Sequence, residues 1–132
     1  MGVVMARLRA LTAEARAALG RDSVLIEHWP YRIGRWSSGG ESKNLDLALV
    51  DQQPYRVSRD HLLLRLEHGQ VAVYDQGSRL GSWMGGQALG GRQRFRGPVH
   101  VGEQGLDVVL GGPQSPLRYA LQPLSAAGGG RD

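Results

Sequence analysis

Two short stretches, Tyr31-Arg32-Ile33-Gly34-Arg35 and Val57-Ser58-Arg59-Asp60-His61, decide how this chain is expected to fold and bind. Each stretch sets polar or cationic residues at the point where a short apolar strand meets a loop. Loops held by a rigid sheet scaffold carry a large share of binding sites. The two stretches therefore predict a binding site at the edge of a β-rich domain.

The composition favours a single, turn-rich β domain. The chain has 132 residues, of which 41% are hydrophobic and 21% are charged, and this suits one domain with a real core. Its 20 glycines argue against a helix-rich protein, because glycine destabilises element interiors and collects in turns. Lys43 is the only lysine among 16 basic residues, and the net charge is +4. The planar guanidinium group of arginine matches the geometry of phosphate and carboxylate oxygens. The predominance of arginine and the positive net charge therefore weakly favour an anionic partner.

Several classes of function lack the residues that they need. The absence of cysteine excludes disulfides and thiolate chemistry, and the four histidines do not have the spacing of metal ligands. The Gly-rich stretch lacks the Gly-Lys-Ser/Thr of a P-loop. Ser58, His61 and Asp75 are the residue types of a catalytic triad, but no nucleophile elbow accompanies them. We expect that the protein is not an enzyme and that it binds no cofactor and no metal.

No stretch predicts a signal peptide or a membrane span, because no apolar run approaches the ~18 residues that a spanning helix needs. A cytoplasmic location is therefore expected. We expect one domain in which residues 1–22 form an N-terminal strand and a short helix, residues 23–124 form the main β-sandwich, and residues 125–132 form a flexible tail.

Alternation of apolar and polar residues predicts about ten to eleven short strands. The expected strands are 4–10, 23–29, 31–35, 44–50, 61–66, 70–74, two within 75–91, 99–101, 106–110 and 117–121. A short helix is predicted over 13–19, with Thr12 as its N-cap and Gly20 after its end. Strands spaced by roughly 8–12 residues favour an all-β sandwich or barrel.

Three motifs resemble the forkhead-associated (FHA) family, whose members are β-sandwiches that read phosphothreonine. The motifs are Gly34-Arg35, then Ser58-Arg59-Asp60-His61, then Asp75-Gln76-Gly77-Ser78 with Gly81-Ser82 and Gly86 after it, and Asn44-Leu45-Asp46-Leu47 lies between the first two. Their order and spacing are similar to those of the family over roughly residues 23–121. The resemblance implies an antiparallel-rich sandwich that binds phosphothreonine segments of partner proteins, the products of Ser/Thr kinases.

The resemblance also assigns roles to single residues. It implies that Arg35, Ser58 and Arg59 bind the phosphate, which carries about −1.5 to −2 charges and three acceptor oxygens. A guanidinium can meet two of these oxygens at once. Ser58 is expected to donate its hydroxyl, with its backbone N–H as an additional donor. His61 is expected to brace the binding loops without touching ligand.

Several glycines are expected to support the site through the backbone conformations that they allow. Gly34 ends the first strand of the motif, and Gly81 and Gly86 lie in the later turns, where glycine allows backbone conformations with positive φ. We expect these residues to shape the site without contacting ligand.

The loop expected to face the flanking peptide departs from the family pattern. Leu80 stands where the family has an asparagine whose amide holds the phosphopeptide backbone, and leucine has no donor or acceptor. We expect Arg79 to reach the ligand backbone or an acidic side chain, and Leu80 to make an apolar contact. Leu80, together with Gly85 in place of a second asparagine, leaves an alternative open: a phosphate-independent interaction or scaffold module on an FHA fold.

Arg92, Arg94 and Arg96 alternate with Gln93 and Phe95, which would make one face of a strand basic. Nucleic-acid-binding proteins use such stripes, but three arginines on a strand usually form a solvated face. We expect neither nucleic acid nor a membrane as a partner.

Overall fold

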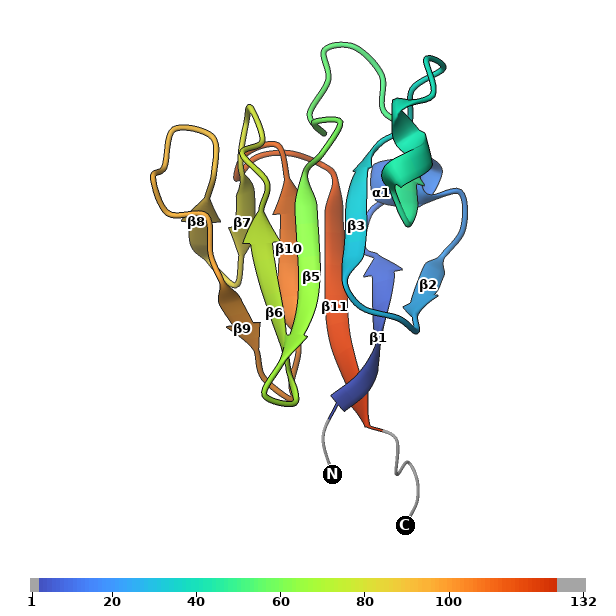
Figure 1. The fold of residues 1–132 in the computed structure, drawn as a ribbon. Coiled ribbons are helices and arrows are strands. Elements are labelled where there is room, and N and C mark those ends of the chain that lie inside the picture. Colours follow the sequence, from blue (N-terminus) through green and yellow to red (C-terminus); the bar gives the residue numbers. More distant parts are fainter. Residues whose placement is uncertain (1–2, 126–132) are drawn as a thin grey trace.

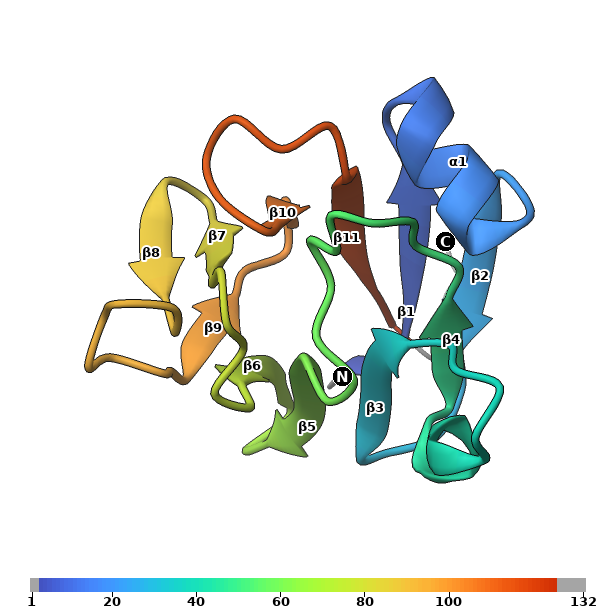
Figure 2. The ribbon, with the colours of Figure 1, turned by 90° about the horizontal axis from the view of Figure 1, so that it is seen from above.

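The computed structural model describes residues 3–125, which form a sandwich of two β-sheets and one short α-helix (Figure 1). One sheet has six strands in the order β2-β1-β11-β10-β7-β8, and the other has five in the order β4-β3-β5-β6-β9. Figure 2 shows the two sheets as separate layers. The expected all-β sandwich is confirmed. Within the described residues, no helix is long and apolar enough to cross a membrane.

The elements follow the alternation of the sequence closely. Their bounds are β1 (Val3–Ala10), α1 (Ala13–Leu19), β2 (Ser23–Ile26), β3 (Tyr31–Arg35), the 3₁₀ helix η1 (Glu41–Asn44), β4 (Leu47–Leu49), β5 (Leu62–Glu67), β6 (Gln70–Asp75), β7 (Ser82–Met84), β8 (Gln87–Leu89), β9 (Val99–Val101), β10 (Leu106–Leu110) and β11 (Arg118–Ser125). All strand pairs are antiparallel except β3 with β4. Of the tail expected over 125–132, Ser125 ends β11 and the remainder lies outside the described residues.

Helix α1 begins and ends where the sequence predicts. Thr12 accepts a hydrogen bond from the Ala15 N–H at 3.0 Å, and Gly20 caps the other end with φ 82°. The helix is fixed to β11 and to the residue that follows β4, because Ala15 O accepts from the Tyr119 hydroxyl and Ala18 O accepts from the Val50 N–H. Burial raises the pKa of Tyr119, which therefore keeps its proton and remains the donor to the helix.

Four expectations differ from the structure. The strand expected over 23–29 is only β2, which ends at Ile26. The strand expected over 44–50 is only Leu47–Leu49, because Asp46 instead holds the Arg32 N–H with its carboxylate at 2.7 Å. The strand expected over 117–121 extends to Ser125 and lies inside the six-stranded sheet, between β1 and β10. The stretch 92–96 is an exposed loop between β8 and β9, so the basic strand face considered above does not form.

The topology gathers the loops of interest at one end of the sandwich. The loops after β3, β4, β6, β8 and β10 lie at the top of Figure 1 with α1, opposite the end where β1 begins and β11 finishes. The inner faces of the sheets hold the buried apolar side chains, such as Leu8, Ile33, Leu64, Val73 and Tyr119. A packed core beneath them gives these loops a rigid base.

Gly34 sets how closely β3 approaches the β4–β5 loop. A Cβ atom at Gly34 would lie 1.8 Å from the backbone oxygen of Arg59, a distance that no side chain can occupy. In the same contact region Arg35 N donates to Ser58 O at 3.0 Å, and His61 N donates to Ile33 O at 3.1 Å. The absence of a side chain at Gly34 therefore lets the second motif lie directly on the first.

A buried polar network joins the two sheets beneath the loops. The ring of His61 is fully buried. Its Nδ1 accepts from the Ser58 N–H at 3.0 Å, and its Nε2 lies 3.1 Å from Gly81 O and 3.0 Å from Ser82 Oγ. Because Nδ1 accepts, the neutral ring carries its proton on Nε2. His61 thus ties the β4–β5 loop to β7 of the opposite sheet.

Asp75 completes this network from the end of β6. Its carboxylate accepts four hydrogen bonds, from Gly77 N, Ser78 N, Ser78 Oγ and Ser82 Oγ, at 2.7–2.8 Å. Gly81 N in turn donates to Ser78 Oγ at 3.0 Å. A buried carboxylate is tolerated when its oxygens are satisfied in this way, and the result is a fixed β6–β7 loop.

The close approach at Gly34 predicts that Gly34→Ala destabilises the domain by about 1–3 kcal/mol, the usual cost of overpacking. Gly102→Ala is the matched control, because the nearest atom to its Cβ would be the flexible Gln104 Oε1 at 3.4 Å. Urea unfolding of the three proteins checks this. An unfolding midpoint for Gly34→Ala equal to that of the wild type would show that the two motifs do not pack as described.

The buried imidazole predicts that stability falls in mild acid. Burial lowers the pKa of His61 in the folded state, with the charge of Asp75 acting in the opposite direction. The unfolded chain therefore binds more protons below pH ~6.5, and the free energy of unfolding drops by up to about 1.4 kcal/mol per pH unit there, while staying level above pH ~7. Urea unfolding between these values measures the slope.

The same prediction has a direct spectroscopic check. By NMR, the His61 ring should remain neutral on acidification through pH ~6.5, the range in which a free imidazole takes up its proton. A stability that is flat below pH ~6.5, or a His61 ring that takes up its proton near pH ~6.5 like a free imidazole, would contradict the account.

Candidate functional site

The candidate site centres on the side chain of Arg35, at the end of β3. One guanidinium nitrogen, Nη1, donates to Val57 O at 2.9 Å, and the guanidinium carbon lies 3.9 Å above the centre of the Tyr55 ring. Both partners belong to the β4–β5 loop. The side chain is half-buried and retains N–H groups beyond the one used by Val57, because a guanidinium has five.

Ser58 lies beside Arg35, and its hydroxyl and its backbone N–H have different hydrogen-bond partners. Its hydroxyl oxygen accepts from the Arg79 N–H at 2.9 Å, which leaves the hydroxyl proton free to be donated. Its backbone N–H is bound to His61 Nδ1. The backbone N–H is therefore already used within the protein, and only the hydroxyl of Ser58 remains as the donor expected from the sequence.

Arg79 is tied to the same loop. Besides its N–H bond to Ser58, its guanidinium Nη2 donates to Tyr55 O at 3.2 Å. The structure thus brings Arg35, Ser58 and Arg79 together around the backbone of residues 55–58. Arg59 follows Ser58 on the loop with an exposed side chain, and within residues 3–125 this side chain forms no hydrogen bond or ion pair.

Leu80 and Gly81 continue the β6–β7 loop. Leu80 is 43% exposed and lines a hollow with Trp83. Gly81 has φ 88°, a conformation that favours glycine, and its carbonyl lies in hydrogen-bonding range of the His61 ring. Leu80 therefore offers an apolar surface beside the polar group formed by Arg35, Ser58 and Arg79.

Two residues of this site were not singled out from the sequence. Tyr55 stacks on Arg35. Asp51 fixes the loop, because its carboxylate accepts from the N–H groups of Gln52, Arg56 and Val57 at 2.7–2.9 Å. An aspartate that opens a loop commonly binds nearby backbone N–H groups, so Asp51 had a recognisable local signal. The stacking of Tyr55 did not.

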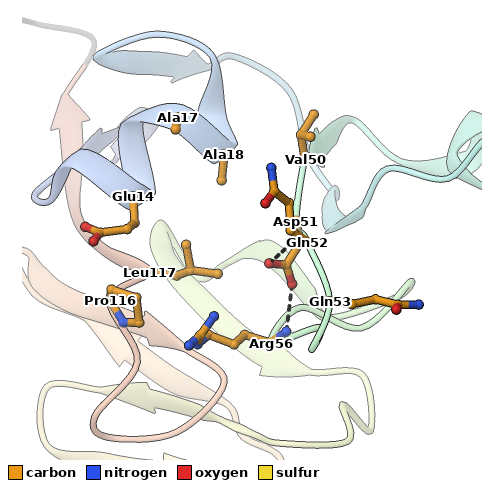
Figure 3. Close-up of a pocket in the computed structure, with 10 residues that line it drawn as sticks. All are labelled: Glu14, Ala17, Ala18, Val50, Asp51, Gln52, Gln53, Arg56, Pro116 and Leu117. Atoms are coloured by element: carbon orange, nitrogen blue, oxygen red, sulfur yellow. Dashed lines mark hydrogen bonds between the residues drawn. The ribbon is translucent and has the colours of Figure 1, made fainter.

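A separate pocket of about 340 Å³ lies on the α1 side of the β4–β5 loop (Figure 3). Ala17 and Ala18 of α1, Val50, Arg56 and Leu117 contribute to its walls. Arg56 therefore lines this pocket and not the hollow beside Leu80. Among the described residues, no group of three or more His, Cys, Asp or Glu side chains is placed to hold a metal ion.

One protein family and several solved structures match this chain. The model of the FHA domain family matches residues 31–100, more than half of the chain, and a search of curated proteins finds no match. The first FHA domain of Mycobacterium tuberculosis Rv1747 is similar in structure, with a TM-score of 0.61 and 19% identity over 92% of this chain and 97% of that one.

Two further structures are similar over nearly their whole lengths. The kinase-interacting FHA domain of the Arabidopsis phosphatase KAPP has a TM-score of 0.64 and 17% identity, covering 95% of this chain and 98% of that one. An FHA domain solved in a study of phosphothreonine-dependent interactions has a TM-score of 0.56 and 16% identity, covering 89% and 95%. FHA domains are interaction modules that bind phosphopeptides and are generally not enzymes. The resemblance found in the sequence is confirmed, and the chain belongs to the FHA domain family.

Proposed function

We propose that this domain binds phosphothreonine in partner proteins, with the phosphate held by Arg35, Ser58 and Arg59. The observation that carries the proposal is the fixed guanidinium of Arg35, clamped between Val57 O and the Tyr55 ring. A cation whose position is set before binding loses little conformational entropy when an anion arrives. The partner would be a product of a Ser/Thr kinase, and the domain would act by binding and not by catalysis.

Ser58 supports the proposal through the direction of its hydrogen bonds. Its oxygen already accepts from Arg79 N, so its proton is available to a phosphate oxygen next to Arg35. Arg59 adds a second cation on the same loop. Hydrogen bonds to charged groups contribute roughly 1.5–3 kcal/mol each, and three of them near the upper end of this range reach about −8 kcal/mol, which is micromolar binding.

Gly34, His61 and Gly81 would support the site without contacting the phosphate. Gly34 permits the contact between the two motifs, and the ring of His61 holds the Ser58 N–H on one side and faces Gly81 O on the other. Because the hydrogen bonds of His61 orient Ser58, its loss would weaken binding by moving the loop.

The flanking peptide would meet Arg79 and Leu80. Arg79 carries a cation close to Ser58, whereas Leu80 has no polar side-chain atom and is 43% exposed. The exposed leucine is also the feature that favours the second candidate, a phosphate-independent interaction module. Comparing phosphorylated with unphosphorylated peptides separates the two functions, because only the first requires the phosphate.

Arg35→Ala should weaken binding of a phosphothreonine peptide by about 10- to 100-fold, the effect of losing one or two charge-assisted hydrogen bonds. Arg32→Ala is the matched control, since Arg32 lies on the same strand with an exposed side chain. Isothermal titration with a degenerate phosphothreonine library, and with phosphoserine and unphosphorylated versions, measures both. Equal affinity for phosphorylated and unphosphorylated peptides would reject the phosphothreonine proposal in favour of the scaffold function.

Leu80→Asn should tighten binding of the same peptides by about three- to tenfold, because an amide restores one or two neutral hydrogen bonds to the peptide backbone. Leu25→Asn removes a similarly exposed leucine on β2, at 39% exposure, and should have no effect. If Leu80→Asn leaves the affinity unchanged, the flanking peptide does not pass this position.

A further inference from the structure

The positive charge of this chain is concentrated in one segment. Residues 76–102 contain Arg79, Arg92, Arg94 and Arg96 and no aspartate or glutamate, so this segment alone equals the net charge of +4 of the whole chain. Three of these arginines lie in the loop between β8 and β9. The β8–β9 loop is therefore a local cationic surface, and outside residues 76–102 the positive and negative side chains of the sequence are equal in number.

The arginines of the β8–β9 loop are not neutralised by the protein. Arg92, Arg94 and Arg96 are exposed, and within residues 3–125 none of the three forms an ion pair. Arg16 and Arg65, by contrast, pair with Asp22 and Glu67 at 3.5 Å. Phe95 stands among the three arginines with 41% of its surface exposed. The loop thus presents three free guanidinium groups and an apolar ring to a partner.

The β8–β9 loop is held in one conformation by its own backbone. Gly90 N donates to Phe95 O at 2.9 Å, and Gln93 N donates to Gly90 O at 2.8 Å. At its far end, Arg96 O accepts from Asp75 N at 2.8 Å. The arginines are therefore displayed on an ordered turn, which lowers the entropy cost of binding an anion.

This loop adjoins the proposed phosphate site. Gly91 N donates to Ser78 O at 3.0 Å, and the guanidinium of Arg96 lies over Gly77, where a Cβ would meet its Nη1 at 3.2 Å. A hollow of about 280 Å³ lies between the two loops, with Arg79, Arg92, Leu80 and Trp83 in its walls and no acidic residue among those that line it.

We propose that the β8–β9 loop and this hollow form a second anion-binding subsite, which takes a carboxylate or a second phosphate of the same phosphorylated partner. The inference rests on the proposed phosphothreonine function. Arg79 N is 2.9 Å from Ser58 Oγ, so the hollow begins where the phosphate site ends. An extended peptide advances about 3.3 Å per residue, and an acidic side chain within a few residues of the phosphothreonine therefore reaches Arg92.

The test uses fluorescence anisotropy with three sets of synthetic peptides. One peptide has a phosphothreonine and neutral flanks, the second set places a glutamate at successive flanking positions on either side, and the third places a phosphoserine at the same positions. They are titrated into the wild type and into the triple variant Arg92→Gln, Arg94→Gln, Arg96→Gln. The control is the triple variant Arg7→Gln, Arg9→Gln, Arg21→Gln, which removes the same charge around β1 and β2, at the opposite edge of the six-stranded sheet from β8.

We expect at least one acidic position to raise the affinity of the wild type about three- to tenfold over the neutral peptide, as several exposed ion pairs would. This gain should shrink with added salt, vanish in the β8–β9 loop variant and persist in the control. The neutral peptide should bind all three proteins alike. A larger gain for phosphoserine than for glutamate identifies a second phosphate as the preferred group, and an equal gain identifies any carboxylate.

Three results would overturn the inference in distinguishable ways. If the neutral phosphothreonine peptide binds but acidic peptides gain nothing, or gain equally in the loop variant, the second subsite is absent while the phosphothreonine function stands. If no phosphothreonine peptide binds, the function fails and the subsite with it. If acidic peptides gain nothing but a single-stranded oligonucleotide binds the wild type and not the loop variant, the loop is a nucleic-acid surface instead.

Discussion

The proposed site depends on one buried imidazole, that of His61, which lies at the start of β5 and contacts three segments at once. Through Nδ1 it holds the Ser58 N–H, and through Nε2 it reaches Gly81 O and Ser82 Oγ. The loop that carries Ser58 and the loop that carries Arg79 therefore have a common anchor. Protonation of Nδ1 would replace an acceptor by a donor facing the Ser58 N–H, so the loops keep their arrangement only while the ring is neutral.

Two cationic groups next to this anchor, those of Arg35 and Arg79, are positioned by backbone carbonyls and an aromatic ring and not by acidic partners. Arg35 is held by Val57 O and by the Tyr55 ring, and Arg79 by Tyr55 O. A carbonyl or an aromatic face fixes a guanidinium without cancelling its charge, whereas a carboxylate would compete with the ligand. The Asp51 carboxylate, which shapes the β4–β5 loop, is bound to backbone N–H groups. The site is thus ordered while its positive charge remains available.

Part of this arrangement could be predicted from local patterns, because the alternation in β1, the Thr12 cap and Gly20 at the end of α1 act within a few residues. The Gly34-Arg35 and Ser58-to-His61 motifs could be predicted because their order and spacing resemble those of the FHA family. What could not be predicted depends on contacts between distant segments: the stacking of Tyr55 on Arg35, the use of the Ser58 N–H by His61, and the place of β11 inside its sheet. The loop at 92–96 shows the limit of periodicity, since alternating arginines there follow a turn and not a strand.

The central claim is that Arg35 and Ser58 meet the phosphate of a phosphothreonine, and NMR with the isotope-labelled domain tests it most directly. Titration with a phosphothreonine peptide should shift the side-chain Nε–H signal of Arg35 and the backbone N–H signals of Ser58 and Arg79, while signals of β1 and β2 remain in place. The unphosphorylated peptide should leave all of them unchanged. Shifts confined to other surfaces, or identical shifts with and without the phosphate, would contradict the account.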